Sequence, residues 1–318
     1  MHENRHPPFP DESRSLLDFP VPMDHAAMMR VLDLFVSRYN FLSVYTMGTS
    51  LHGRSIPMVR IGNEKASRTV LYVGTHHGME WITTVLLLRF INEYAEHYRS
   101  HRRIFNINPE YLYRSRLLCI VPMLNPDGVE LQIHGAEDAP NRERLIAMNQ
   151  GSGDFTHWQA NGRGVDLNHN YNAGFAAYKE MERSAGILGG ASTRYSGEYP
   201  ESEPEVGVLA NYLRFDDSVK LLLTLHTQGE EIYYTSEGKC PPKAKNIARL
   251  LSQMSGYSLS EAMGMASFGG LTDWAIRELN LPSFTIECGK GVNPLPLDTH
   301  FSIYTAIREM LFTAPILI

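Results

Sequence analysis

Residues 70–81, VLYVGTHHGMEW, decide the fold and carry the first chemical signal in the chain. The apolar run 70–73 predicts a short buried strand, and the apolar pattern from residue 82 predicts a helix to about residue 98. His77 and Glu80 therefore lie where a buried strand runs into a helix. Residues three apart in a helix or tight turn share a face, so this imidazole and carboxylate can bind one zinc ion. By itself the pair is only half a metal site, and a polar turn is the simpler explanation.

Three further apolar runs resemble the first, and polar residues do not alternate through them. They cover residues 116–122, 219–225 and 282–286, and helical patterns lie between them. Such strands are typical of a mostly parallel sheet that is buried on both faces. We therefore expect an α/β fold, a single domain with a mixed, mostly parallel central sheet and helices on both faces.

The rest of the chain gives a consistent order of elements. Residues 1–23 are rich in proline and polar side chains and predict a loose N-terminal arm, followed by one domain over residues 24–318. Asp24 is suited to cap a first helix that runs to about residue 39. Alternation of apolar and polar residues predicts strands at 45–48 and 56–61, with a turn at 51–55 between them. Helical spacing of apolar residues predicts helices at 204–213, 244–254 and 299–312. The segment NPDG at 125–128 predicts a turn.

Two of the apolar strands end directly at a residue that can take part in metal chemistry. His226 follows the run 219–225, and Glu287 follows the run 282–286. Either residue alone is more often a surface or capping side chain. In parallel sheets, however, ligands bind beyond the carboxyl ends of the strands, where His77 and Glu80 are also expected.

Together these four residues provide the parts of a hydrolytic zinc site. Two histidines and one glutamate, His77, Glu80 and His226, would hold one Zn²⁺ per chain and leave a position for water. The pKa of water falls toward 7 on zinc. Glu287 would take the proton of that water and later deliver it to the leaving amine.

Composition and charge exclude several other classes of protein. The net charge of −6 and the pI near 6.1 argue against a nucleic-acid-binding protein, which needs a basic face. The three cysteines are widely spaced and do not form a disulfide framework. Residues 1–8 lack the apolar core of a signal peptide, and no apolar run reaches the length that crosses a bilayer. We therefore expect a cytoplasmic protein with no nucleic-acid or membrane partner.

The chain also resembles the zinc carboxypeptidase family, M14, from about residue 45 to its end. The matching segments fall in the family's order: HGMEWI at 77–82, NPDG at 125–128, GVDLN at 164–168, YSG at 195–197 with SEPE at 202–205, LHT at 225–227 and FTIE at 284–287. The resemblance implies zinc on His77, Glu80 and His226, with Glu287 as the general base.

Within that family the likeness is greatest to the bacterial γ-D-glutamyl-diaminopimelate peptidases, which cut the stem peptide of cell walls. The segments that carry it are HGMEWIT at 77–83, WQANGRGVDLN at 158–168, HTQGEEIY at 226–233 and ECGKGVNPLP at 287–296. The resemblance implies a peptide substrate, a peptidoglycan stem peptide.

Two positions depart from the carboxypeptidase pattern. The family binds the terminal carboxylate of its substrate with an Asn-Arg pair, and here the pair is Asn168-His169. Histidine lacks the bidentate fork and the constant charge of arginine. The family's mobile tyrosine falls on Met265, which cannot donate a hydrogen bond. Both changes favour a substrate that is held differently from one in a classical carboxypeptidase.

Several other residues are candidates for contacts with the substrate. Arg163 is our first candidate for the oxyanion donor, and Gln159 is the second. By resemblance, Thr227 helps to hold the substrate. The residues just beyond it are Gln228, Glu230 and Glu231. The alternative for each glutamate is a solvated side chain or one that orients His226. We expect Glu230 or Glu231 to bind an amine of the substrate. His76 has the wrong spacing from Glu80 and is interpreted as a bystander.

The sequence thus predicts a zinc-dependent metallopeptidase that hydrolyses an amide bond in bacterial cell-wall peptides, with the γ-D-glutamyl–diaminopimelate bond as the first candidate. A metallocarboxypeptidase on ordinary peptides and an N-acyl amino acid deacylase are alternatives among enzymes. A non-catalytic, zinc-containing protein that binds wall peptides is the alternative of another class. Glu287 argues against the last one, because a binding protein has no need of a general base.

Overall fold

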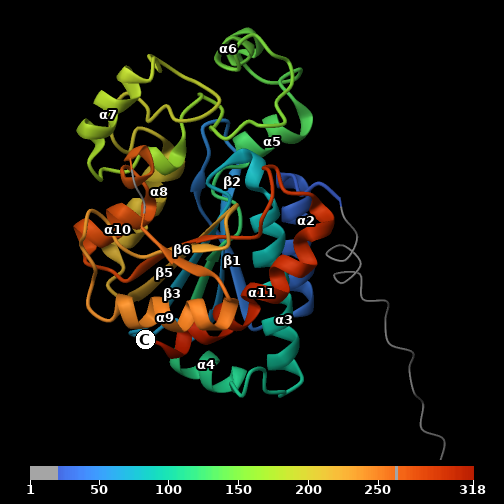
Figure 1. The fold of residues 1–318 in the computed structure, drawn as a ribbon. Coiled ribbons are helices and arrows are strands. Elements are labelled where there is room, and N and C mark those ends of the chain that lie inside the picture. The colour runs from blue at the N-terminus through green and yellow to red at the C-terminus, as the bar shows by residue number, and fades with distance from the viewer. Residues whose placement is uncertain (1–20, 262–263) are drawn as a thin grey trace, which may run out of the picture.

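A mixed sheet of eight strands runs through the centre of the computed structural model, which describes residues 21–261 and 264–318 (Figure 1). The strands are β1 (Leu42–Thr49), β2 (Ser55–Gly62), β3 (Thr69–Gly74), β4 (Leu117–Val121), β5 (Val219–His226), β6 (Glu231–Tyr233), β7 (Ser258–Ser260) and β8 (Ser283–Glu287). They lie in the order β1-β2-β4-β3-β5-β8-β6-β7.

The central strands are parallel, as the sequence predicted. β3 pairs in parallel with β4 and β5, and β5 pairs in parallel with β8. β2 runs antiparallel to both β1 and β4, and β6 runs antiparallel to β8. The carboxyl ends of β3, β5 and β8 consequently meet at one edge of the sheet.

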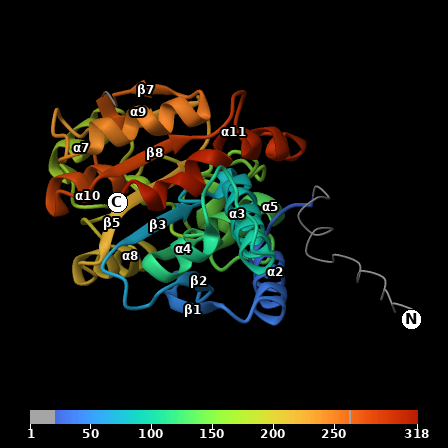
Figure 2. The same cartoon turned by 90° about the horizontal axis from the view of Figure 1, so that it is seen from below.

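Helices cover both faces of this sheet (Figures 1 and 2). Their bounds are α2 (His25–Arg38), α3 (Ile82–Arg99), α4 (Pro109–Ser115), α5 (Pro126–His134), α6 (Arg142–Met148), α7 (Phe175–Ser184), α8 (Pro204–Phe215), α9 (Ala244–Ser255), α10 (Leu271–Leu279) and α11 (His300–Thr313). Five short 3₁₀ turns complete the described elements: η1 (Gly78–Glu80), η2 (Leu167–His169), η3 (Gly264–Ser267), η4 (Leu297–Thr299) and η5 (Ala314–Ile316).

The strand β3 shows why the sheet needs both layers. Successive side chains of a strand point to opposite faces. Val70 and Tyr72 pack in the cluster that includes α2, α3, α9 and α11, whereas Leu71 and Val73 pack in the cluster that includes α8 and α10. All four side chains are fully buried. This two-sided burial confirms the predicted fold class.

The N-terminal helix begins where its capping residue predicted. The Asp24 side chain accepts a hydrogen bond from the backbone N–H of Ala27, at 2.7 Å, and α2 starts at His25. Residues 1–20 of the predicted arm lie outside the described residues. Of the remaining three, Met23 is only 2% exposed and packs in the core with α2 and α3. Within the described ranges, no helix is long and apolar enough to cross a membrane.

The predicted turn at NPDG is wrong, because these residues begin a helix. The Asn125 side chain accepts from the backbone N–H of Gly128, and Pro126 is the first residue of α5. An asparagine followed by a proline can start either a turn or a helix, and both use the same local hydrogen bond. The packing of α5 against η1 decides between them: a Cβ on Gly78 would lie 2.4 Å from the carbonyl oxygen of Gly128.

Several short elements carried no clear sequence pattern. The region 130–164 gave no predicted element, but it contains the end of α5 and all of α6. The elements α4, α7, α10, β6 and β7 were also not predicted. β6 and β7 have three residues each, too few for a period to be visible. Figure 1 shows α5, α6 and α7 at one end of the sheet, away from α4 and the C-terminus.

A buried carboxyl at the start of α8 gives the protein a pH-dependent stability. Glu205 is fully buried, and its Oε1 accepts from the backbone N–H of Leu51 at 3.0 Å. Burial raises the pKa of Glu205 from 4.5 to about 7. The folded state therefore binds the proton of the Glu205 carboxyl more tightly than the unfolded state does. The stability that this proton contributes is fully present below pH 4.5 and is lost as the pH rises through 7.

Glu205→Gln should remove this dependence, because the amide stays neutral at every pH. Between pH 4.5 and about pH 8.5, the difference in unfolding free energy should move by about 3 kcal/mol in favour of the variant. Urea unfolding of zinc-free wild type and variant measures it without interference from metal release. The exposed Glu198→Gln is the control, and equal pH profiles for wild type and Glu205→Gln would contradict the assignment.

Candidate functional site

The turn after β3 positions the first two predicted ligands. Thr75 follows the strand with a left-handed φ of 54°, and its backbone N–H donates to the hydroxyl of Thr83 in α3 at 2.9 Å. The chain then enters η1, with His77 just before it and Glu80 as its last residue. This short turn brings both side chains onto the same side, as the spacing predicted.

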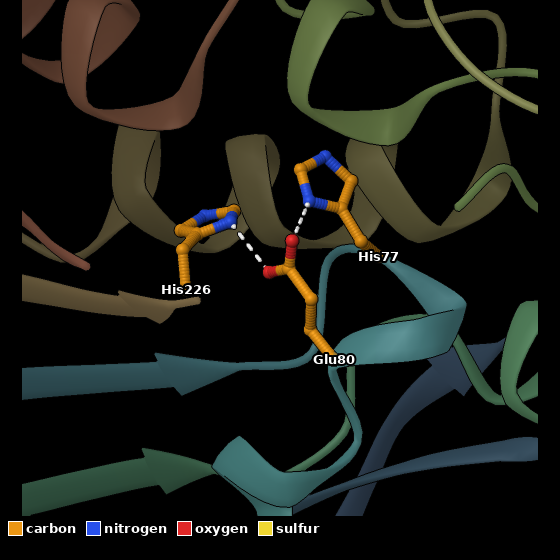
Figure 3. Close-up of side chains that lie close together, drawn as sticks. All are labelled: His77, Glu80 and His226. Carbon is orange, nitrogen blue, oxygen red and sulfur yellow. Dashed lines mark hydrogen bonds and ion pairs between the residues drawn. The ribbon is translucent and has the colours of Figure 1, made fainter. Parts of the chain in front are cut away.

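β5 brings the third predicted ligand to the same place. His226 is the last residue of β5, and its Nδ1 lies 3.2 Å from Glu80 Oε2. The Nδ1 of His77 lies 2.9 Å from Glu80 Oε1, so the carboxylate stands between the two imidazoles (Figure 3). One ligand atom from each of the three residues lies within 4.8 Å of the others. The structure therefore assembles the trio that the strand ends indicated.

This donor set fits a zinc ion. Zinc takes nitrogen and oxygen ligands near 2.1 Å, so two ligand atoms of a tetrahedral site lie about 3.4 Å apart. The two contacts of Glu80 with the histidines are close to that separation. Burial alone would raise the pKa of Glu80, but the charges of His77 and His226 and their hydrogen bonds lower it to about 2. Glu80 and Asp166 in turn raise the pKa of His77 against the effect of burial, so zinc would displace a proton from this histidine when it binds.

Asp166 fixes the orientation of the first ligand. Its Oδ1 lies 3.1 Å from His77 Nε2, the nitrogen that does not face Glu80. A carboxylate on the outer nitrogen of a ligating histidine fixes its tautomer and makes the inner nitrogen a better ligand. The sequence motif GVDLN contains Asp166, but the chain gives no spacing rule that links residue 166 to residue 77.

Asp166→Asn should weaken zinc binding or activity roughly 10- to 100-fold, because an amide holds the histidine less firmly than a carboxylate. Competition with a colorimetric chelator measures the zinc affinity, and turnover of a peptide substrate measures the activity. Asp138→Asn, at an exposed carboxylate on another loop, is the control. Wild-type zinc affinity and activity in Asp166→Asn would show that His77 needs no support from this residue.

The predicted general base lies beside the third ligand. Glu287 is the last residue of β8 and is the register partner of His226 on β5. Burial, with a further contribution from the nearby carboxylate of Glu80, raises the pKa of Glu287 to about 8. A carboxyl group that titrates near neutral pH can both accept and return a proton.

The residues after His226 connect the metal ligands to another loop. The backbone N–H of Thr227 donates to Glu80 Oε2 at 3.2 Å, and its hydroxyl donates to Asn293 Oδ1 at 2.8 Å. Asn293 returns a hydrogen bond to the carbonyl of Thr227 at 2.7 Å. The peptide bond between Thr227 and Gln228 is cis, and the Gln228 side chain is exposed. No role for Asn293 was predicted from the sequence, because only the folded chain places residue 293 beside residue 227.

The two positions that depart from the family pattern, His169 and Met265, lie in the short turns η2 and η3. His169 Nδ1 lies 2.8 Å from the carbonyl oxygen of Phe268, and its ring stacks on Tyr178 with centroids 4.3 Å apart. Burial lowers the pKa of His169, which favours its neutral form. Asn168 Oδ1 accepts from the backbone N–H of Leu271 at 3.1 Å, and Met265 lies half-buried in η3. His169 is thus held by its neighbours and carries no constant charge.

The two candidates for the oxyanion donor have different surroundings. Arg163 Nε lies 3.3 Å from Glu203 Oε2, and the residue lines a surface pocket with Leu51 and Met148. The backbone carbonyl of Gln159 accepts from the N–H of Gly78 at 2.9 Å, so Gln159 lies directly beside η1. Thr193 donates its hydroxyl hydrogen bond to the side-chain oxygen of Gln159. Arg163 is thus paired with a carboxylate, whereas Gln159 lies next to the turn that carries Glu80.

The remaining candidates have local partners. Glu230 Oε2 lies 2.7 Å from Lys290 Nζ, and Glu231 Oε2 accepts from the Tyr233 hydroxyl at 2.5 Å. The role of either glutamate in reading a substrate amine stays a prediction. His76 is buried, with its ring nitrogens 3.2 Å from the Tyr171 hydroxyl and 3.4 Å from the Thr224 hydroxyl. His76 also stacks on the ring of His226, with centroids 5.2 Å apart, and its interpretation as a bystander stays a prediction.

Comparison with known proteins adds independent evidence. The profile of the zinc carboxypeptidase family, peptidase M14, matches residues 28–306. A gamma-D-glutamyl-L-diamino acid endopeptidase 1 of Lysinibacillus sphaericus is 35% identical over 283 residues, which cover 88% of this chain and 69% of that protein.

Solved structures show the same fold at lower identity. Thrombin-activatable fibrinolysis inhibitor superposes with a TM-score of 0.69 at 18% identity, over 96% of this chain and 75% of that one. The murein-tripeptide amidase MpaA from Escherichia coli O157 superposes with a TM-score of 0.53 at 21% identity, over 85% of this chain and 91% of that one.

The family match and the geometry agree with each other. The profile covers the segments that carry His77, Glu80, His226 and Glu287, and the donor set suits the metal that gives the family its name. Zinc is accordingly the cofactor of this protein. The chain belongs to the zinc carboxypeptidase family M14 and is a zinc-dependent metallopeptidase.

Proposed function

We propose that this metallopeptidase hydrolyses the γ-D-glutamyl–diaminopimelate amide bond of peptidoglycan stem peptides. The observation that carries the hydrolytic part is the meeting of β3, β5 and β8, which places His77, Glu80, His226 and Glu287 at one edge of the sheet. The identity to an endopeptidase named for γ-D-glutamyl-L-diamino acid substrates supports the choice of bond.

The chain's own residues divide the work as follows. His77, Glu80 and His226 hold the zinc, which supplies Lewis-acid chemistry that polarises a carbonyl and lowers the pKa of water. Glu287 accepts a proton from the attacking water and delivers it to the amine of the leaving diamino acid. Asp166 keeps His77 in one orientation throughout.

We assign the oxyanion donor to Gln159 rather than Arg163. Thr193 holds the oxygen of the Gln159 amide, which leaves its NH₂ group as a donor close to the ligand turn. The guanidinium of Arg163 instead forms an ion pair with the buried carboxylate of Glu203. His169 offers no constant charge to a carboxylate of the substrate, so this position lacks the arginine with which a classical carboxypeptidase binds its substrate.

Mass spectrometry of the products from L-Ala-γ-D-Glu-meso-diaminopimelate tests the proposal. We expect release of free diaminopimelate by the zinc-loaded protein and no release after chelation. No cleavage by protein that carries stoichiometric zinc would reject this bond and favour ordinary peptides or N-acyl amino acids as substrates.

A further inference from the structure

An exposed arginine near the site is held in an unusual backbone conformation. Arg194 lies in the loop between α7 and α8, with a left-handed φ of 65°. Its backbone N–H donates to Asp166 Oδ2 at 3.0 Å, and its carbonyl accepts from the Tyr178 hydroxyl at 2.8 Å. A non-glycine residue adopts this conformation only when its surroundings impose it. The two hydrogen bonds impose it here, and they fix the direction in which the side chain leaves the loop.

The same carboxylate positions Arg194 and the first metal ligand. Asp166 Oδ1 faces His77 Nε2 at 3.1 Å, while its Oδ2 accepts from Arg194. The loop residue is therefore one side chain away from a zinc ligand. A shift of Asp166 would move both, so the arrangement keeps the arginine backbone in a fixed place relative to the reacting centre.

The charge of Arg194 is available to a ligand. Among the residues that the structure describes, none makes a hydrogen bond or an ion pair with its guanidinium, and the side chain is exposed. Other arginines around the site are engaged: Arg54 pairs with Asp127, and Arg163 pairs with Glu203. A guanidinium without a protein partner, on a residue whose backbone is bonded to Asp166, is suited to a substrate anion.

The charge also lies near the position where the family pattern lost its arginine. The carbonyl of Arg194 accepts from the Tyr178 hydroxyl, and the positive charge of Arg194 contributes to lowering the pKa of His169. Those two rings stack on each other. The backbone of Arg194 is thus bonded to the tyrosine that stacks on His169, the histidine at the position of the family's carboxylate-binding residue.

We propose that Arg194 binds a carboxylate of the substrate, namely the one on the diaminopimelate carbon next to the scissile amide. This inference rests on the proposed function, because it assigns a specificity-determining residue to that reaction. The planar guanidinium fork matches a carboxylate with two parallel hydrogen bonds. The substrate's carboxylate nearest to the cleaved bond is the one that a cation beside Asp166 can meet.

Two matched substrates test the assignment. They are L-Ala-γ-D-Glu-meso-diaminopimelate with that carboxylate free, and the same peptide with it converted to a carboxamide. Wild type should prefer the free acid in kcat/KM. Arg194→Met should lose roughly 10- to 100-fold on the acid and little on the amide, because a hydrogen-bonded charge is removed. Arg194→Lys should keep part of the preference, since it retains the charge without the fork.

Arg183→Met is the matched control, because Arg183 is an exposed arginine that pairs with Glu180 on the nearby α7. It should keep the wild-type preference. Zinc content measured in each variant reports whether Asp166 still supports His77. An unchanged acid preference in Arg194→Met, or an equal loss on both substrates, would overturn the inference and leave the proposed function standing. Failure of zinc-loaded wild type to cleave either peptide would instead overturn the proposed function.

Discussion

Glu287→Gln should lower kcat about a thousandfold while zinc stays bound, because a general base is worth roughly 10²–10⁴ in rate. Glutamine has nearly the same shape as glutamate, but its amide cannot accept the proton of the attacking water. His77, Glu80 and His226 are unchanged, so the variant should still bind zinc and peptide. Steady-state kinetics on the stem tripeptide, together with metal analysis of the same sample, give both quantities.

The same variant separates an enzyme from a binding protein. Glu278→Gln, on the exposed side of α10, controls for the loss of one carboxylate and should turn over at the wild-type rate. A Glu287→Gln protein with undiminished kcat would remove Glu287 from the mechanism. Zinc-dependent peptide binding without turnover in the wild type would revive the interpretation as a binding protein.

His226→Ala should abolish stable zinc binding and reduce activity at least about a thousandfold, since the metal contributes several kcal/mol of stabilisation to the transition state. Two of the three ligands would remain, and a catalytic zinc site normally uses three from the protein. Wild type treated with a chelator should lose activity in the same way and recover it when zinc is returned. His226→Ala should not recover.

Thermal unfolding of the same samples provides a second readout. A ligand that binds only the folded state raises its stability, so zinc should raise the melting temperature of wild type and leave His226→Ala unchanged. His101→Ala, at an exposed histidine on another loop, should behave as wild type in both assays. Full activity of His226→Ala would mean that the metal does not use the end of β5.

Local sequence patterns located the strands of this site. The runs at residues 70–73 and 219–225 are mostly apolar, lack alternation and are short for helices, which favours strands that are buried on both faces. A residue that directly follows such a strand must emerge at the carboxyl edge of the sheet. The positions of His77, Glu80 and His226 follow from that rule.

Local sequence patterns gave a wrong prediction where the same residues can start either a turn or a helix. Asn125 and Pro126 start α5 instead of a turn, and the choice depends on the close contact between the backbones of Gly78 and Gly128. The oxyanion donor shows the same limit. Arg163 and Gln159 are near neighbours in sequence, yet one pairs with Glu203 and the other lies beside η1.

The sequence by itself determined the fold class and predicted that His77, Glu80, His226 and Glu287 lie at one edge of the sheet, because each of these depends on apolar runs and on the residues that follow a strand. The tertiary structure alone decided which side chains support that centre. Asp166, Asn293 and Arg194 lie far along the chain from the residues they hold or accompany. Hydrogen bonds between distant loops form only when the sheet has brought those loops together, and no local pattern records them.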